Sequence, residues 1–217
     1  MLINSQRICP LCLSKSISGE TIGSLRQPIF QCGNCHLAYT NPDFYPDYES
    51  ERERYNLHYN KPEDERYRSF LNRAVLPTLP YLTTGLKALD YGCGSGPTIQ
   101  FLLREKGISC SNFDPIFYPE FPQTTFDVIF ATECVEHFHH PLIDFQKICS
   151  LLKTNGILTL MTHPYQKLEE FPNWYYTKDP THVVFYHPKT FAFIEREFGL
   201  NILATPEERV YIFRKTS

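Results

Sequence analysis

The sequence lacks several features that would assign a protein class at once. It contains no apolar run close to the roughly 20 residues that a membrane-spanning helix needs. Lys and Arg number 21 against 24 Asp and Glu, and the net charge of -3 predicts neither a strongly basic nucleic-acid binder nor a polyanionic tail. The first residues show no basic head, apolar stretch and small-residue cleavage site, so no signal peptide is predicted. We therefore expect a cytoplasmic protein without membrane contact.

Cysteine is also sparse: the 217 residues include eight cysteines, too few for a fold held together by disulfides. Four of them form two C-x2-C pairs, Cys9 with Cys12 and Cys32 with Cys35. Each pair lies on a tight turn that can direct two thiolates to one point, and two such pairs complete the tetrahedral shell that Zn²⁺ prefers. A shell of four thiolates leaves no open position for water, so we expect the zinc to be structural.

Changes in composition divide the sequence into three parts. Residues 1–40 hold the cysteine pairs and short strand-like runs, and are predicted to form a small zinc-ribbon module. Residues 41–80 are polar and tyrosine-rich, and are predicted to form a linker and a leading helix. This helix has a favourable start at Pro62 and is expected to end or kink near Pro77. Residues 81–217 are predicted to form an α/β domain.

Strands and helices are expected to alternate through the third part. The pattern predicts strands over residues 86–91, 108–113, 126–131 and 156–161, and helices over residues 98–106 and 142–152. The second helix is expected to stop at Asn155-Gly156. Strands separated by helices predict a Rossmann-like, mostly parallel sheet with helices on both faces. Residues 200–204 and 210–214 differ, because the turn-prone segment between them predicts a C-terminal antiparallel hairpin.

A glycine-rich loop follows the first of these strands and opens the next helix, in the segment Asp90-Tyr-Gly92-Cys-Gly94-Ser-Gly96. Glycines let the backbone approach a ligand, and the N-terminus of a helix is electropositive. Asp114 ends the next strand, where a carboxylate can accept hydrogen bonds from both hydroxyls of a ribose. The third glycine is one residue early for a dinucleotide loop, and Asp90 suits the ammonium group of a methionine. These residues favour S-adenosylmethionine as the cofactor.

Two segments resemble known sequence motifs. Residues 89–96 look like motif I of the class I S-adenosylmethionine-dependent methyltransferases. Residues 126–137 resemble the strand-four region of the branch that includes ubiquinone-biosynthesis-type enzymes. The resemblance extends from Pro62 to the C-terminus. It implies that Gly92, Gly94 and Asp90 hold the methionine part. It also implies that Asp114 holds the ribose and that Thr132 lies beside the sulfonium.

One departure from the family pattern lies between Asp114 and Phe126. The intervening segment is too short for the family's usual third strand and helix. The acid that commonly contacts the adenine amino group from there has no counterpart, so the adenine must be held in another way.

The methyl acceptor is expected to bind beyond the fourth strand. Methyl transfer is an in-line displacement in which the protein mainly aligns the reactants, with a base where the acceptor holds its proton tightly. The candidate bases are His137, His163 and His182, of which His137 and His182 are the predicted catalytic residues. The alternatives are that His137 is bonded to backbone at a helix end, and that His182 pairs with Asp179 to fix its loop.

Aromatic side chains are concentrated in two segments: Tyr55, Tyr59 and Tyr67 in the leading part, and Phe171, Trp174, Tyr175 and Tyr176 before the terminal hairpin. The first set is predicted to help the leading helix close over the cofactor, or else to cover an edge of the core. The second set is predicted either to stack on a planar or sugar acceptor or to cap the core.

The sequence as a whole predicts a methyltransferase that acts on a small-molecule acceptor, sugar- or quinone-like, at oxygen or carbon. A four-cysteine module before such a domain resembles a subset that includes sugar methyltransferases from antibiotic pathways. One alternative is an RNA methyltransferase, although Arg7, Lys15 and Arg26 alone make a thin basic patch in the zinc-ribbon module. The other is a non-catalytic scaffold whose zinc-ribbon module recruits a partner.

Overall fold

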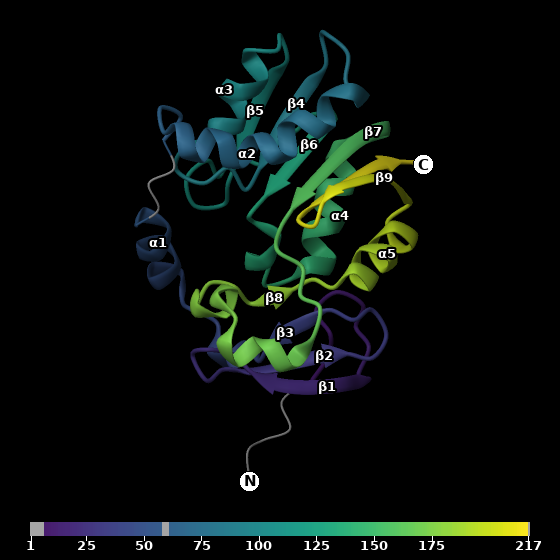
Figure 1. The fold of residues 1–217 in the computed structure, drawn as a ribbon. Coiled ribbons are helices and arrows are strands. Elements are labelled where there is room, and N and C mark those ends of the chain that lie inside the picture. The colour runs from purple at the N-terminus through teal and green to yellow at the C-terminus, as the bar shows by residue number, and fades with distance from the viewer. Residues whose placement is uncertain (1–6, 58–60, 217) are drawn as a thin grey trace.

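The computed structural model describes residues 7–57 and 61–216, which form two sheets joined by helices and 3-10 turns (Figure 1). The larger sheet has six strands and the smaller has four. Among the described residues, no helix is long and apolar enough to cross a membrane.

The larger sheet has the strand order β5-β4-β6-β7-β10-β9. Its strands are β4 (Lys87–Tyr91), β5 (Ser109–Phe113), β6 (Phe126–Thr132), β7 (Leu152–Met161), β9 (Leu200–Glu207) and β10 (Val210–Lys215). The first four pair in parallel, whereas β10 is antiparallel to both β7 and β9. The Rossmann-like sheet and the terminal hairpin are therefore confirmed. The described residues 114–125, which connect β5 to β6 along the chain, add no strand to the sheet.

Helices cover both faces of this sheet. On one face, α2 (Glu65–Thr78) and α3 (Thr98–Arg104) pack with Leu71, Leu102 and other buried residues against β4 and β6. On the other, α4 (Pro141–Leu151) and α5 (Pro188–Glu197) bury apolar side chains such as Phe145 and Phe191. Helix α2 begins after Asp64, whose carboxylate accepts hydrogen bonds from the first free N–H groups. The expected start at Pro62 is wrong, because Asp64 takes the capping position and Pro62 lies before the helix. The helix ends one residue past Pro77, as the sequence predicts.

The expected stop of α4 at Asn155-Gly156 is wrong. Helix α4 ends at Leu151 and β7 starts at once, so these two residues lie inside the strand. Asn155 has a positive φ of 62°, at the place where the register with β6 shifts. The left-handed backbone conformation that Asn tolerates therefore occurs at a register shift within β7 and does not end a helix.

The smaller sheet contains a strand from a distant part of the chain. Its order is β1 (Ile17–Ile22), β2 (Pro28–Cys32), β3 (Ala38–Thr40) and β8 (Val184–Phe185). We call residues 162–187, which connect β7 to α5 and contain β8, the insertion; it also holds the 3-10 turns η4 (Leu168–Asn173) and η5 (Tyr175–Lys178). Figure 1 shows the insertion folding down onto the N-terminal strands.

Polar contacts attach the insertion to the smaller sheet. The Ser24 backbone N–H donates to the Thr177 hydroxyl at 3.0 Å, and the Gln27 side chain donates to the Thr177 carbonyl at 3.1 Å. The Tyr165 hydroxyl donates to the His36 carbonyl at 2.6 Å. The N-terminal strands therefore form the base on which the insertion rests.

A polar helix that the sequence pattern does not predict, α1 (Tyr48–Asn56), lies at one side of the molecule, at a level between the larger and the smaller sheet (Figure 1). Asp47 caps it by accepting a hydrogen bond from the Ser50 N–H. None of its residues is buried, and it lacks the apolar periodicity that marks a packed helix.

Candidate active site

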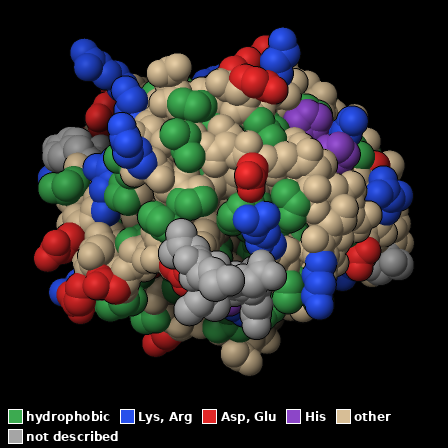
Figure 2. Space-filling model, turned by 90° about the horizontal axis from the view of Figure 1, so that it is seen from below, with side chains coloured by type: hydrophobic (Ala, Val, Ile, Leu, Met, Phe, Trp, Pro, Cys, Tyr) green, Lys and Arg blue, Asp and Glu red, His purple; other side chains and the backbone are tan. Residues whose placement is uncertain are grey.

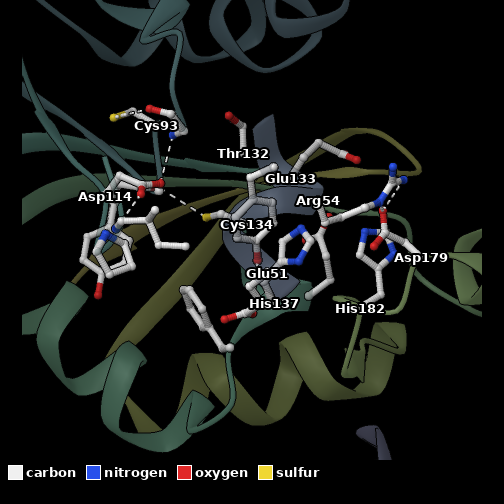
Figure 3. A pocket seen from close by; sticks show the side chains of 18 of the residues that line it. Glu51, Arg54, Cys93, Asp114, Thr132, Glu133, Cys134, His137, Asp179 and His182 are labelled. Atoms are coloured by element: carbon white, nitrogen blue, oxygen red, sulfur yellow. Dashed lines mark hydrogen bonds and ion pairs between the residues drawn. The ribbon is translucent and has the colours of Figure 1, made fainter. Parts of the chain in front are cut away.

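A cavity of about 770 Å³ opens at the carboxyl ends of β4, β5 and β6. This is the edge at which open α/β sheets bind ligands. Its walls come from the glycine loop, the end of β5, the segment after β6, helix α1 and the insertion. Figure 3 shows Asp114 and Cys93 on one side, and Arg54, Asp179 and His182 on the other.

The glycine loop brings backbone to the cavity wall. Gly92 and Gly94 both have positive φ, 75° and 62°. A Cβ on Gly92 would lie 2.5 Å from that of Cys134, so the loop passes too close to the segment after β6 for any side chain there. A Cβ on Gly94 would meet no atom within 4 Å, because that residue faces open space. The loop therefore leaves room for a ligand beside its backbone.

Asp114 is fixed at the cavity edge by backbone donors. Its Oδ2 accepts a hydrogen bond from the Gly94 N–H at 3.0 Å, and its Oδ1 accepts from the N–H groups of Ile116 and Phe117 at 2.9 and 3.0 Å. The carboxylate thus ties the glycine loop to the end of β5. It lines the cavity together with Gly92, Gly94 and Thr132.

Asp90 differs from the other predicted cofactor residues. It is 2% exposed and is not among the described residues that line the cavity. Burial, with a further contribution from Asp114, raises the pKa of Asp90 to about 8. A buried carboxyl with this pKa gains from a nearby cation, because ionisation is otherwise costly.

The two predicted catalytic histidines, His137 and His182, lie side by side in the cavity wall. Their ring centroids are 4.8 Å apart. His137 Nδ1 is 3.0 Å from the Thr181 carbonyl oxygen, and His182 Nδ1 is 2.7 Å from that of Tyr176. A carbonyl only accepts hydrogen bonds, so each Nδ1 carries the proton. Burial and the neighbouring His182 lower the pKa of His137 to about 4, so its ring is neutral at neutral pH.

His163, the third candidate base, is held differently. Its Nδ1 lies 2.9 Å from the Tyr175 hydroxyl and 3.0 Å from Nη2 of Arg209. Burial and the positive charge of Arg209 lower the pKa of His163 to about 4. It is not among the described cavity-lining residues, although Tyr175 and Arg209 are.

Two glutamates complete the acidic part of the cavity, and sequence reasoning does not assign them a role. Glu133 has a positive φ of 48°, and burial together with Glu136 raises its pKa to about 8. Glu136 is fully buried, and its Oε1 accepts a hydrogen bond from the Tyr176 hydroxyl. Glu133 Oε1 and Glu136 Oε2 have no hydrogen-bond partner among the described residues. The signal was present in Glu133-Cys-Val-Glu136-His137, which places both acids directly before a candidate histidine.

Helix α1 and the aromatic residues border the same cavity. Tyr55 of α1, Tyr67 of α2, and Tyr175 and Tyr176 of η5 line it. Phe171 is buried among aromatic residues of the insertion instead. The prediction for Tyr59 falls outside the described residues.

The four cysteines predicted as zinc ligands lie together, away from this cavity. Their sulfur atoms all lie within 4.8 Å of one another. Cys9 Sγ is 3.5 Å from Cys35 Sγ, and Cys12 Sγ is 3.4 Å from Cys32 Sγ. Zn–S bonds of about 2.3 Å in a tetrahedron place sulfur atoms about 3.8 Å apart, so the donor set fits Zn²⁺.

A Rossmann-like sheet with a glycine-loop cavity at its carboxyl edge is typical of proteins that bind a nucleotide-type cofactor, and a family comparison identifies the reaction class. A family model described as a methyltransferase domain matches residues 59–205, well over half of the chain. The chain belongs to this methyltransferase family, and it is an S-adenosylmethionine-dependent enzyme. A search of curated proteins found no match.

Solved structures agree on the fold. The 1,6-didemethyltoxoflavin-N1-methyltransferase of Burkholderia thailandensis, solved with bound 1,6-didemethyltoxoflavin and S-adenosylhomocysteine, is 15% identical to this chain. Its TM-score is 0.58, over 92% of this chain and 100% of that one. A candidate methyltransferase from Bacillus halodurans is 13% identical, with a TM-score of 0.50 over 69% of this chain and 100% of the other.

Proposed function

We propose that this protein transfers a methyl group from S-adenosylmethionine to oxygen or carbon of a small-molecule acceptor that is sugar- or quinone-like. The observation that carries the proposal is one cavity that joins the glycine loop and Asp114 to the His137–His182 pair. The family resemblance of residues 126–137 favours the branch that includes ubiquinone-biosynthesis-type enzymes.

The cofactor residues have separate roles in this proposal. Gly92 and Gly94 present backbone to the methionine part, and Asp90 supplies negative charge for its ammonium group. Asp114 holds the ribose hydroxyls, and Thr132 borders the sulfonium. The cofactor supplies an activated methyl group, so the chain's task is to align the acceptor with it.

The shape of the cavity supports a small acceptor. Helix α1 and the insertion enclose it, and six tyrosines among its described lining residues offer rings for stacking on a planar or sugar acceptor. Acidic and basic side chains are intermingled on the face drawn in Figure 2, which is not the broad basic surface that holds a nucleic acid. His137 and His182 are the residues proposed to act on the acceptor.

A structural zinc ion is proposed at Cys9, Cys12, Cys32 and Cys35. Residues 1–40 would then form a zinc-ribbon module, residues 41–80 a linker and leading helix, and residues 81–217 the methyltransferase domain. Four thiolates complete the coordination of Zn²⁺, so the ion would stabilise the smaller sheet and take no part in catalysis.

Calorimetric titration with S-adenosylmethionine and S-adenosylhomocysteine tests the cofactor assignment. Micromolar binding of both is expected, and no binding to folded, zinc-loaded protein would contradict it. Asp114→Ala should weaken binding about tenfold or more, because two ribose hydroxyls lose a charged acceptor. Asp43→Ala, at an exposed position, is the matched control and should bind like the unchanged protein.

A further inference from the structure

The side chains of Glu136, His137 and His182 present one potential ligand atom each within 4.8 Å of one another. All three line the cavity. From this geometry we infer a second metal site, distinct from the four cysteines, that binds one divalent transition-metal ion at the acceptor end of the cavity.

The hydrogen bonds around the two histidines orient them as metal ligands. Each Nδ1–H donates to a backbone carbonyl, that of Thr181 for His137 and that of Tyr176 for His182. These bonds fix the tautomer in which Nε2 carries the lone pair. A backbone carbonyl that accepts from the second ring nitrogen is the usual outer partner of a metal-bound histidine.

The carboxylate of Glu136 gives an independent indication of a cation. The residue is fully buried, and Oε2 has no hydrogen-bond partner among the described residues. Burying an unpaired carboxylate oxygen is costly unless a positive group compensates. The Tyr176 hydroxyl donates to Oε1 and so leaves Oε2 as the oxygen that would face the ion.

The donor set indicates which ions fit. Two imidazole nitrogens and one carboxylate oxygen suit Mn²⁺, Fe²⁺, Co²⁺ or Zn²⁺, and such a three-residue set leaves positions open on the cavity side. The site itself does not depend on the proposed function, but its role does. In an oxygen methyltransferase, the ion would bind the acceptor through oxygen and lower the pKa of its hydroxyl.

Mn²⁺ is a selective probe, because it prefers nitrogen and oxygen ligands over thiolates. Paramagnetic resonance counts free Mn²⁺ as the full chain is titrated, and one bound ion per chain is expected. Zn²⁺ uptake by metal-free protein in equilibrium dialysis should reach two equivalents. One Zn²⁺ per chain together with no Mn²⁺ binding would overturn the inference.

Two variants assign the site to these residues. Glu136→Gln should weaken Mn²⁺ binding at least about tenfold, since the charged ligand is lost. Tyr176→Phe leaves all three ligands in place and should weaken it about tenfold or more by removing the hydroxyl that orients Glu136. His140→Gln, an exposed histidine outside the cluster, is the control. If Glu136→Gln and Tyr176→Phe bind Mn²⁺ as tightly as the control, the metal-site assignment is wrong. Binding of S-adenosylhomocysteine to the same variants tests the cofactor site separately.

Discussion

Arg54 of helix α1 forms an ion pair with Asp179 of the insertion in the wall of the cavity. Its Nη2 and Nε lie 2.7 and 3.0 Å from the same carboxylate oxygen, Oδ2. Asp179 Oδ1 accepts from the hydroxyl and the N–H of Thr181. Burial raises the pKa of Asp179, but Arg54 and Thr181 outweigh it and hold the pKa well below its usual range. This ion pair connects two walls of the cavity that are 125 residues apart in the chain.

Arg54→Gln should loosen helix α1 over the cavity. The pair is partly exposed, so its loss is expected to cost about 1 kcal/mol and to speed release of S-adenosylhomocysteine about fivefold. Stopped-flow fluorescence of the single tryptophan, Trp174, measures that rate. Arg52→Gln, which breaks an exposed pair with Glu49 in the same helix, should leave it unchanged. Equal rates in the two variants would show that the Arg54–Asp179 pair does not retain the ligand.

Cofactor binding should depend on the protonation of Asp90. With its pKa raised to about 8, this carboxyl is mostly protonated in the ligand-free protein at neutral pH, and pairing with an ammonium group would release the proton. Affinity should therefore rise from about pH 6 to pH 8, by at most about tenfold per pH unit. Calorimetry in two buffers of different ionisation enthalpy counts the released protons. Asp90→Asn should release none, and a wild type that also releases none would exclude the pairing.

The close approach of the glycine loop to Cys134 predicts unequal costs for two alanine substitutions. Gly92 and Gly107 have similar φ angles, 75° and 73°, but a new Cβ meets neighbouring atoms only at Gly92. Gly107→Ala should lose about 1 kcal/mol of unfolding free energy from backbone strain. Gly92→Ala should lose about 1–3 kcal/mol more from the clash. Urea unfolding of ligand-free protein measures both, and equal losses would be incompatible with the close contact.

Loss of one of the four cysteine ligands should loosen the insertion, which walls the acceptor side of the cavity, more than it affects the glycine loop and Asp114. In Cys12→Ser we expect faster amide hydrogen exchange in β1–β3 and in residues 175–185, which rest on those strands. Affinity for S-adenosylhomocysteine should change less than about twofold, because the glycine loop and Asp114 follow strands of the larger sheet, whereas the four cysteines lie in or beside strands of the smaller one. Cys149→Ser, a lone cysteine, is the control. Parallel loss of cofactor binding would mean that the whole chain unfolds as one unit.

Local sequence patterns were sufficient for the larger sheet. Residues 86–91 and 126–131 are short, mostly apolar runs, interrupted only by Lys87, Asp90 and Asp127. Short apolar runs bounded by turn residues are typical of buried parallel strands. The two C-x2-C pairs likewise predict that their sulfur atoms lie together, since each pair is a local turn. The Asn155-Gly156 signal failed because the same left-handed conformation serves helix ends and strand irregularities.

The parts that were not predicted depend on contacts between distant residues. Helix α1 has no apolar stripe, and it forms an ion pair with Asp179 of the insertion, 125 residues from Arg54. Strand β8 has two residues and is defined by its pairing with β3. The environment of Glu136 is set by Tyr176, 40 residues away. Contacts between residues so far apart in the sequence leave no local sequence pattern from which they can be predicted.

Strand β8 also constrains how this enzyme can be recombined with its relatives. Residues 17–40 and the insertion share a sheet, so a hybrid protein with a crossover between them would join strands that were not selected to pair. Such a hybrid would leave the edge of β3 open to pairing between molecules and would deprive the insertion of its support. Exchange of acceptor specificity between relatives should therefore require both segments from the same parent.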